Sequence, residues 1–290
     1  MTTVAFLLVL ASAVSHASWN FLLKRSQHKV AFLWSMAGVS FVAFLVPAAV
    51  FAAIDGVGVR GVAFGLTSGV LHAAYGVSLA RGYQIGDLSA VYPISRGMGP
   101  ALIPLVAVLL LGESVSPGAG VGIALVVLGV LFIQSEAERL ADLARPLRGL
   151  GRPAIVIALL TGALITTYSV WDKASLEYLA PVTLNQFSMS GYVVLLAPLA
   201  FQARGVPLRA EWRERGWSIV AAGLLAPLAY IFVLIALTTS RISYVAPARE
   251  VGIVLGALLG VVLLGEGYGP VRLLGSGLIV AGVVTLALAP

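Results

Sequence analysis

The sequence predicts an all-α integral membrane protein with ten transmembrane helices, arranged as two inverted five-helix repeats. Two observations carry this prediction. Of the 290 residues, 60% are hydrophobic and only 10% are charged, and the mean hydropathy is +1.02, whereas a soluble domain carries about 25% charged residues. In addition, one segment of the chain occurs twice. A chain with so much apolar side chain can bury it only in a lipid bilayer.

Ten apolar stretches are long enough to cross the bilayer, which takes about 20 residues. They cover residues 3–23, 31–54, 62–80, 90–111, 117–134, 153–172, 181–203, 217–239, 244–264 and 270–289. The first is too long for a signal-peptide core and lacks a basic leader, so we expect it to be retained. The domains predicted are a first repeat over residues 1–134, a polar linker over 135–152 and a second repeat over 153–290.

The duplication is clearest where residues 89–113 align without a gap with residues 242–266. Arg96 falls on Arg249, Leu111-Gly112-Glu113 on Leu264-Gly265-Glu266, and Pro117 on Pro270. A matched Arg, Glu and Pro at one offset rarely arises by chance. Because each repeat has an odd number of spans, the second must enter the membrane from the opposite side. The halves are then inverted copies, an architecture typical of transporters.

Basic residues are unevenly divided between the two sides of the membrane. Arg60, Lys173 and Arg241 fall on one side, and every other Lys and Arg, apart from the intramembrane Arg96 and Arg249, falls on the other. Since Lys and Arg favour cytoplasmic loops, we expect both termini outside the cytoplasm, in a multi-pass protein of the cell inner (plasma) membrane. The net charge of +6 then reflects topology and not a nucleic-acid partner.

Three motifs resemble the drug/metabolite transporter superfamily, specifically its EamA-type ten-helix members. They are YPISRG…P…LLLGE from Tyr92 to Glu113, its echo APAREVG…LLGE from Ala246 to Glu266, and the opening HASWNFLLKRS from His16 to Ser26. The resemblance covers essentially the whole chain. It implies two inverted five-helix bundles that carry amino acids, other small metabolites, sugar derivatives or drugs, often outward. Many members look as if they keep both termini in the cytoplasm, and the loop charges here argue the reverse.

Arg96 and Arg249 are the leading substrate-binding candidates. Each lies about six residues, or about 9 Å, into its span. An ionisable group at depth costs about 3 kcal/mol on insertion scales and usually faces a cavity. Two guanidiniums that approach the midplane from opposite sides can hold a carboxylate or phosphate. The alternatives are side chains that reach back to the interface, or a structural pair with a helix end or a carboxylate.

Glu250 is the candidate for proton coupling, because its counterpart in the first repeat is Gly97. A carboxylate at this depth can bind a coupling proton. It can equally neutralise Arg249 or Arg96 in a structural pair.

Further candidate substrate-binding residues lie on other spans. In the first span Ser12, His16, Asn20 and Lys24 recur every four residues, with Trp19 beside them, and this spacing gives one polar face that must point into the bundle. His72 and Tyr75 lie three residues apart in the third span, and Tyr75 has its counterpart in Tyr230. For each histidine, a hydrogen-bonded packing role is the alternative.

The repeated Glu113 and Glu266 end their helices, and we expect structural roles for both, facing the link to the next helix. Small residues such as Gly122, Gly129 and Gly282 let helices approach closely. The glycines of the fifth and tenth spans are also a candidate homodimer surface.

The leading function is a secondary transporter of a small polar or amphipathic metabolite, amino-acid-like or an organic anion, with export as the expected direction. Gradient-driven alternating access, with proton coupling as one route, is the expected mechanism, because the sequence has no nucleotide-binding motif. The alternative is an integral membrane enzyme or a lipid- or metabolite-handling scaffold without transport. The absence of cysteine and of metal-spaced carboxylates argues against catalysis, so we expect no catalytic residues, no metal and no cofactor.

Overall fold

The computed structural model describes residues 1–290 except 86–87, 135–151, 202–205, 266, 268 and 290, and within this part every regular element is an α-helix. The all-α prediction is confirmed for the described residues. The helices are α1 (Thr3–Lys24), α2 (Lys29–Asp55), α3 (Val59–Ile85), α4 (Leu88–Leu111), α5 (Pro117–Gln134), α7 (Arg152–Ser175), α8 (Pro181–Phe201), α9 (Val206–Thr239), α10 (Ile242–Ala248), α11 (Val251–Leu264) and α12 (Pro270–Leu288).

Apolar composition and length suit these helices to a bilayer. Seven helical segments of the described chain are long and apolar enough to cross a membrane, and shorter apolar helices cover Ser95–Leu111 and Pro117–Ile133. Large apolar side chains such as Val42, Leu110 and Val194 are exposed on the outside of the bundle. Such an apolar surface is unfavourable in water, whereas in a bilayer these side chains contact lipid tails.

Two of the expected spans differ clearly from the helices of the structure. α9 starts at Val206, inside the stretch expected to be a polar connection, and bends at Arg215, where φ is −134°. The span expected over 244–264 is divided into α10 and α11 at Arg249 and Glu250. Pro247 has no N–H to donate, and beyond it the backbone turns tightly, with Glu250 N–H donating to the Pro247 carbonyl at 3.0 Å.

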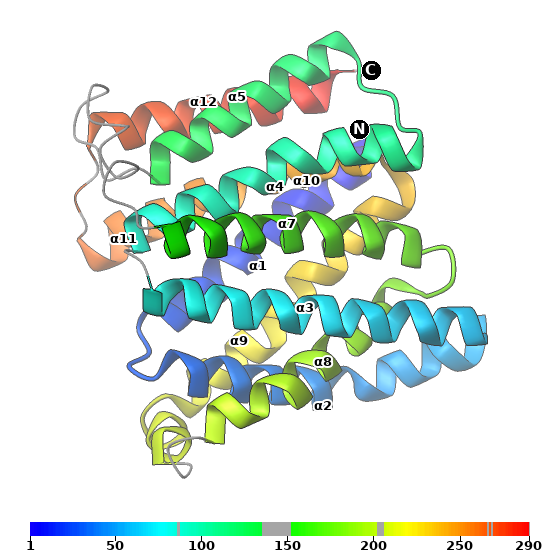
Figure 1. Ribbon diagram of the computed structural model, residues 1–290, viewed down its shortest axis with the longest axis vertical. Helices are drawn as coiled ribbons and strands as arrows, with labels where there is room; N and C mark the ends of the chain where they lie inside the picture. The colour runs from blue at the N-terminus through cyan, green and yellow to red at the C-terminus, as the bar shows by residue number, and fades with distance from the viewer. Residues whose placement is uncertain (86–87, 135–151, 202–205, 266, 268, 290) are drawn as a thin grey trace.

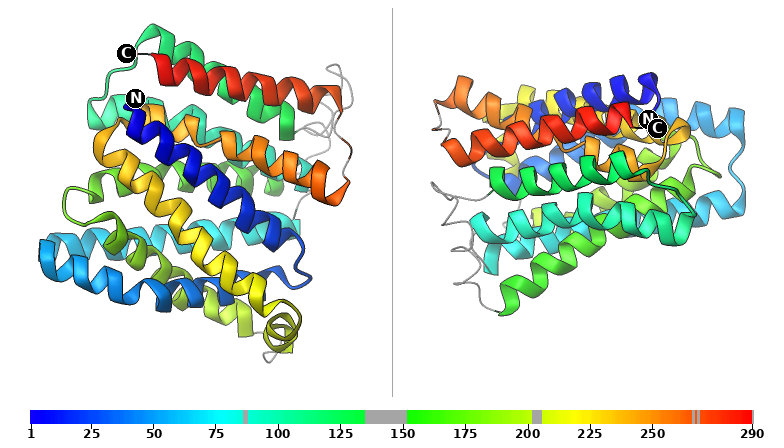
Figure 2. Two further views of the ribbon diagram at one scale, coloured as in Figure 1. Left: turned by 180° about the vertical axis from the view of Figure 1, so that it is seen from behind. Right: turned by 90° about the horizontal axis from the view of Figure 1, so that it is seen from above.

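Helices of one half pack mainly against helices of the other half (Figures 1 and 2). The contacts occur in exchanged pairs: α1 packs on α9 as α7 packs on α3, and α4 packs on α7 as α11 packs on α1. The pairs α2–α8 and α5–α12 each join equivalent helices of the two halves. Such pairing is the contact pattern of two related units around a pseudo-twofold axis.

The chain ends mark one end of the bundle. Both termini lie there with the connection between α4 and α5, whereas the turn between α1 and α2 lies at the opposite end (Figure 1). The turn between α7 and α8, which is the equivalent turn of the second half, lies at the same end as the termini.

Two carboxylates, the half-buried Glu113 and the buried Glu211, cap helix starts in the opposite half of the chain. Glu113 accepts the backbone N–H groups of Ile242 at 2.9 Å and Ser243 at 3.0 Å, so it caps the start of α10 in the other half. The sequence alone suggests only a contact with the link to the next helix of its own half. Glu211 accepts the N–H groups of Gln27 and His28 at the start of α2. A carboxylate on the free N–H groups of a helix start opposes the positive end of its dipole. Glu266 lies outside the described residues.

Glycines bring α5 and α12 into backbone contact. A Cβ added to Gly129 would lie 2.6 Å from the Gly275 carbonyl oxygen, and one added to Gly122 would lie 3.0 Å from that of Gly282. The close approach expected of these glycines therefore occurs within the chain. A homodimer would have to use a different face of these helices.

Candidate substrate site at the broken helix

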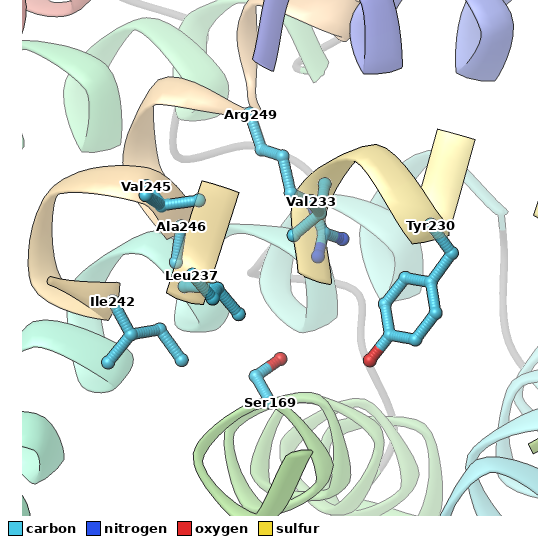
Figure 3. A pocket seen from close by; sticks show the side chains of 8 residues that line it. All are labelled: Ser169, Tyr230, Val233, Leu237, Ile242, Val245, Ala246 and Arg249. Carbon is cyan, nitrogen blue, oxygen red and sulfur yellow. The ribbon is translucent and has the colours of Figure 1, made fainter. Parts of the chain in front are cut away.

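A small cavity lies inside the bundle where α10 meets α11. It is lined by side chains of α7, α9 and α10 together with Arg249, and its volume is about 10 Å³, enough for about one water molecule. Figure 3 shows the Arg249 side chain running from the helix break into this space, with the hydroxyl groups of Ser169 and Tyr230 turned toward it. Apolar side chains, including Leu237 and Ile242, line the other side.

The polar groups around this cavity are not satisfied by one another. Among the described residues, the Arg249 guanidinium makes no side-chain hydrogen bond and no ion pair. The buried Ser169 hydroxyl also has no hydrogen-bond partner. Buried polar groups are nearly always paired, so unpaired donors at one cavity point to a ligand or water.

The two repeated arginines have different surroundings. The Arg96 Nη2 atom lies 3.8 Å from Glu250 Oε2, and the two side chains are 11% and 8% exposed. Glu250 thus pairs with the arginine of the other half, which is the structural alternative that the sequence left open, and not with its neighbour Arg249.

The polar face of α1 points into the bundle. The Ser12 hydroxyl donates to the Ala229 carbonyl of α9 at 2.7 Å. His16 lies within electrostatic reach of Arg96 and Arg249, and its ring meets the Trp19 ring edge-on at 5.1 Å. Asn20 donates its amide to the carbonyl of His16 at 2.8 Å, so this N–H is satisfied within α1. His16 is therefore exposed to the charge of both arginines, whereas Asn20 is hydrogen-bonded within its own helix.

Three helices meet at the carboxylate of Asp172, one of several polar groups of the second half to which the sequence assigns no particular role. Asp172 of α7 is fully buried, with 0% exposure. Its Oδ2 atom lies 2.8 Å from His72 Nε2 of α3, and it also accepts the hydroxyl of Tyr230 of α9. The Tyr230 hydroxyl lies 3.3 Å from the same His72 nitrogen. We call these three side chains the His72–Asp172–Tyr230 cluster.

Aromatic rings enclose this cluster. The Tyr168 ring lies 4.2 Å from the His72 ring, and the Tyr192 ring of α8 lies 6.1 Å from it. Tyr75 meets Tyr168 at 5.5 Å and stays one ring away from the histidine. Of the predicted site residues, His72 and Tyr230 therefore touch each other, and Tyr75 belongs to the surrounding layer.

A second, larger cavity opens at the end of the bundle that carries the termini. It has a volume of about 260 Å³ and is lined by Met1, Thr2, Thr239, Ser240, Arg241 and Tyr244. Leu237 and Ile242 line the inner cavity, and the turn between them, with Ser240 and Arg241, lines the outer one. The end of α9 and the start of α10 therefore form the wall between the two spaces.

Comparison with known proteins shows the family to which the chain belongs. No curated protein sequence matches the chain. A solved structure titled "Crystal structure of protein" superposes with a TM-score of 0.69 at 17% identity, over 99% of this chain and 98% of that one; at such identity the likeness concerns the fold alone. The model of the EamA-like transporter family matches residues 3–135 and residues 152–288. With both halves matched, the chain is a multi-pass membrane protein that belongs to the EamA-like transporter family.

Proposed function

We propose that the protein is a secondary transporter of a small metabolite that carries a carboxylate, phosphate or phosphonate group. The observation that carries this proposal is Arg249, whose guanidinium enters the inner cavity without an ion pair among the described residues. An unpaired cation inside a membrane bundle is energetically costly unless a ligand neutralises it or water solvates it. Guanidinium groups suit carboxylate and phosphate because their paired donors match both oxygens.

The position of Arg249 on a broken span supports this role. Transporter binding sites are typically built where membrane helices are interrupted, near the interface of the repeats. α10 is only seven residues long, which puts Arg249 about 10 Å along the span. The inner cavity has no room for a metabolite, so the described conformation would be an occluded, substrate-free state.

Alternating access would then require the wall between the two cavities to open. The end of α9 and the start of α10 separate the inner cavity from the outer one. Movement of α10 about its junction with α11 would connect Arg249 with the 260 Å³ cavity on the side of the termini. The family's outward carriers favour export as the direction, with termini outside the cytoplasm as the loop charges indicate.

A ligand screen with matched variants tests the anion site. The melting temperature of the purified protein would be followed with amino acids, with phosphorylated and phosphonate metabolites, and with cationic drugs. An anionic or zwitterionic compound should raise the melting temperature of the wild type and of Arg209→Gln, whose arginine is exposed, but not that of Arg249→Gln. Stabilisation by cations alone, or stabilisation retained in Arg249→Gln, would contradict the proposal.

Transport itself is tested in sealed proteoliposomes with a compound from this screen. A carrier shows saturable uptake and counterflow and returns the solute chemically unchanged. A membrane enzyme would alter the solute, and a channel or scaffold would show no counterflow.

The ten-span inverted arrangement has its own test, because the chain contains no cysteine. Gln27 lies in the turn between α1 and α2, and Glu177 lies in the equivalent turn of the second half, and both are exposed. In intact cells, an impermeant maleimide should label Glu177→Cys and not Gln27→Cys. Equal labelling of the two variants would refute the inversion.

A further inference from the structure

In the His72–Asp172–Tyr230 cluster, only one of the two carboxylate oxygens of Asp172 has hydrogen-bond partners. Both hydrogen bonds reach one oxygen, Oδ2, from His72 and Tyr230. The other oxygen, Oδ1, is buried and has no hydrogen-bond partner. With a neutral His72, the cluster carries one negative charge inside the membrane, where charge is expensive.

One proton would make the cluster neutral. It can enter from solvent and bind either to the second nitrogen of His72, which gives an imidazolium–carboxylate pair, or to Oδ1 of Asp172, which gives a carboxylic acid. In both cases one negative charge is lost and no other bond changes. The two sites belong to one hydrogen-bonded pair, because His72 Nε2 lies 2.8 Å from Asp172 Oδ2.

Of the two intramembrane arginines, Arg249 is the one that shares a cavity with a member of the cluster. Tyr230, which donates to Asp172, lines the same cavity as Arg249. Arg96, the other cation of the centre, is within 3.8 Å of Glu250. Among the described residues of the bundle interior, the other titratable and charged groups on the elements packed around the cluster are Tyr75 on α3, Arg96 on α4, Tyr168 on α7, Tyr192 on α8, His16 on α1, and Arg249 and Glu250 at the α10–α11 junction. Lys173 follows Asp172 on α7, and its ammonium group donates to the Leu237 carbonyl of α9 at 2.5 Å.

We propose that the His72–Asp172–Tyr230 cluster is the proton-binding site of this transporter, and that it takes up one proton when an anion binds Arg249. This inference rests on the anion site proposed above. An anion on Arg249 removes the positive charge that offsets Asp172, and a proton then restores neutrality. The linkage is reciprocal, so a bound proton must strengthen anion binding by the same factor. Anion and proton therefore cross the membrane together, in the direction set by their combined gradients.

The packing favours a proton over an organic cation at this carboxylate. Rings of aromatic side chains near an acid can bind an ammonium group, but that group needs space. The inner cavity holds about 10 Å³, and the Tyr168 ring already lies 4.2 Å from His72. A proton needs no cavity. Oε2 of Glu250, the coupling residue expected from the sequence, is also buried without a hydrogen bond. Glu250 is nevertheless the weaker candidate, because the Arg96 guanidinium lies 3.8 Å from this oxygen and offsets its charge.

The cluster also joins the two halves of the chain. His72 belongs to α3 of the first half, and Asp172 and Tyr230 belong to α7 and α9 of the second. Binding of the proton changes a polar contact between units whose relative movement alternating access requires. The proton can thereby act on the conformational step as well as on substrate affinity.

The test is a pH titration of the purified protein in nanodiscs by infrared difference spectroscopy, with no substrate added. We expect a titration of the wild type that is lost in Asp172→Asn, altered in His72→Gln and retained in Tyr230→Phe, which keeps both titrating groups. Arg249→Gln imitates an anion-neutralised arginine, so its titration should move to higher pH. Thermal unfolding and gel filtration of each variant show whether it is folded. Because no transport is measured, this result does not depend on the outcome of the ligand screen.

Several results would overturn the proposal. One is a wild-type titration that survives in folded Asp172→Asn but is lost in Glu250→Gln, which would put the coupling proton on Glu250. Another is an unchanged titration in Arg249→Gln, because the linkage between proton and anion would then be absent. Displacement of the wild-type titration by ethylammonium, and not by sodium, would assign the cluster to an amine ligand instead.

Discussion

The close contact of α5 with α12 gives a prediction whose size follows from the structure. In Gly129→Ala the new Cβ would lie 2.6 Å from the Gly275 carbonyl oxygen and 2.7 Å from a side-chain carbon of Ile279, so the helices must move apart until these contacts reach at least 3.4 Å. Overpacking of this kind costs about 1–3 kcal/mol. Gly120 lies on the same helix with nothing within 4 Å of its Cβ position. There an alanine adds only helix propensity, worth up to about 1 kcal/mol.

The assay is reversible unfolding in mixed dodecylmaltoside and dodecylsulfate micelles. Gly129→Ala should lower the free energy of unfolding and Gly120→Ala should leave it unchanged or raise it, a difference of about 1–4 kcal/mol from the terms above. Gly275→Ala and Gly277→Ala repeat the comparison on α12, because the Cβ of the first would lie 2.7 Å from the backbone nitrogen of Ile133 and that of the second in open space. If the variants of each pair unfold alike, the two helices are not in backbone contact.

The helix caps give two further predictions. Glu113→Gln keeps the side-chain size but loses the charge on the first N–H groups of α10; it should lower the free energy of unfolding by about 1–2 kcal/mol in the same assay, whereas Glu177→Gln, at an exposed position, should not. Glu211→Gln should cost a similar amount through the start of α2, with the exposed Glu214→Gln as its control. Equal stability of Glu211→Gln and Glu214→Gln would show that the buried carboxylate does not cap α2.

The helices were predictable because hydropathy alone marks them. The position of the repeated arginines inside the bundle was predictable because a charged residue in an apolar span is rare and usually faces the protein interior. The sequence placed α1, α5 and α12 within a few residues of their observed bounds. It did not reveal the division of α10 from α11, because Pro247 is one of several prolines in these spans and most leave their helix continuous. Nor did it predict the helix before Arg215, because that stretch is too polar to be taken for a span.

The His72–Asp172–Tyr230 cluster could not be predicted from the sequence. A usable signal was present, since Asp172 is a carboxylate at the end of an apolar run. Its partners lie 100 and 58 positions away in the chain, and only the packing of α3, α7 and α9 brings them together. Spacing within one helix could pair His72 with Tyr75, whereas in the structure each of these rings packs against the ring of Tyr168.

The centre of the bundle has lost the symmetry that the duplication gave it, and this loss supplies an argument about the substrate. Two equivalent halves would present two equivalent arginines, which suit a ligand with two like ends. Glu250 has Gly97 as its counterpart, and it lies beside Arg96 of the other half. The guanidinium of Arg96 is thereby paired within the protein, whereas that of Arg249 has no ion pair among the described residues. When Lys24 is aligned with Lys173, Asp172 falls on Leu23, so the cluster has no counterpart carboxylate in the first repeat either. If Arg249 binds the anion as proposed, the site has one anion-binding end only, and this asymmetry favours a single orientation of the substrate.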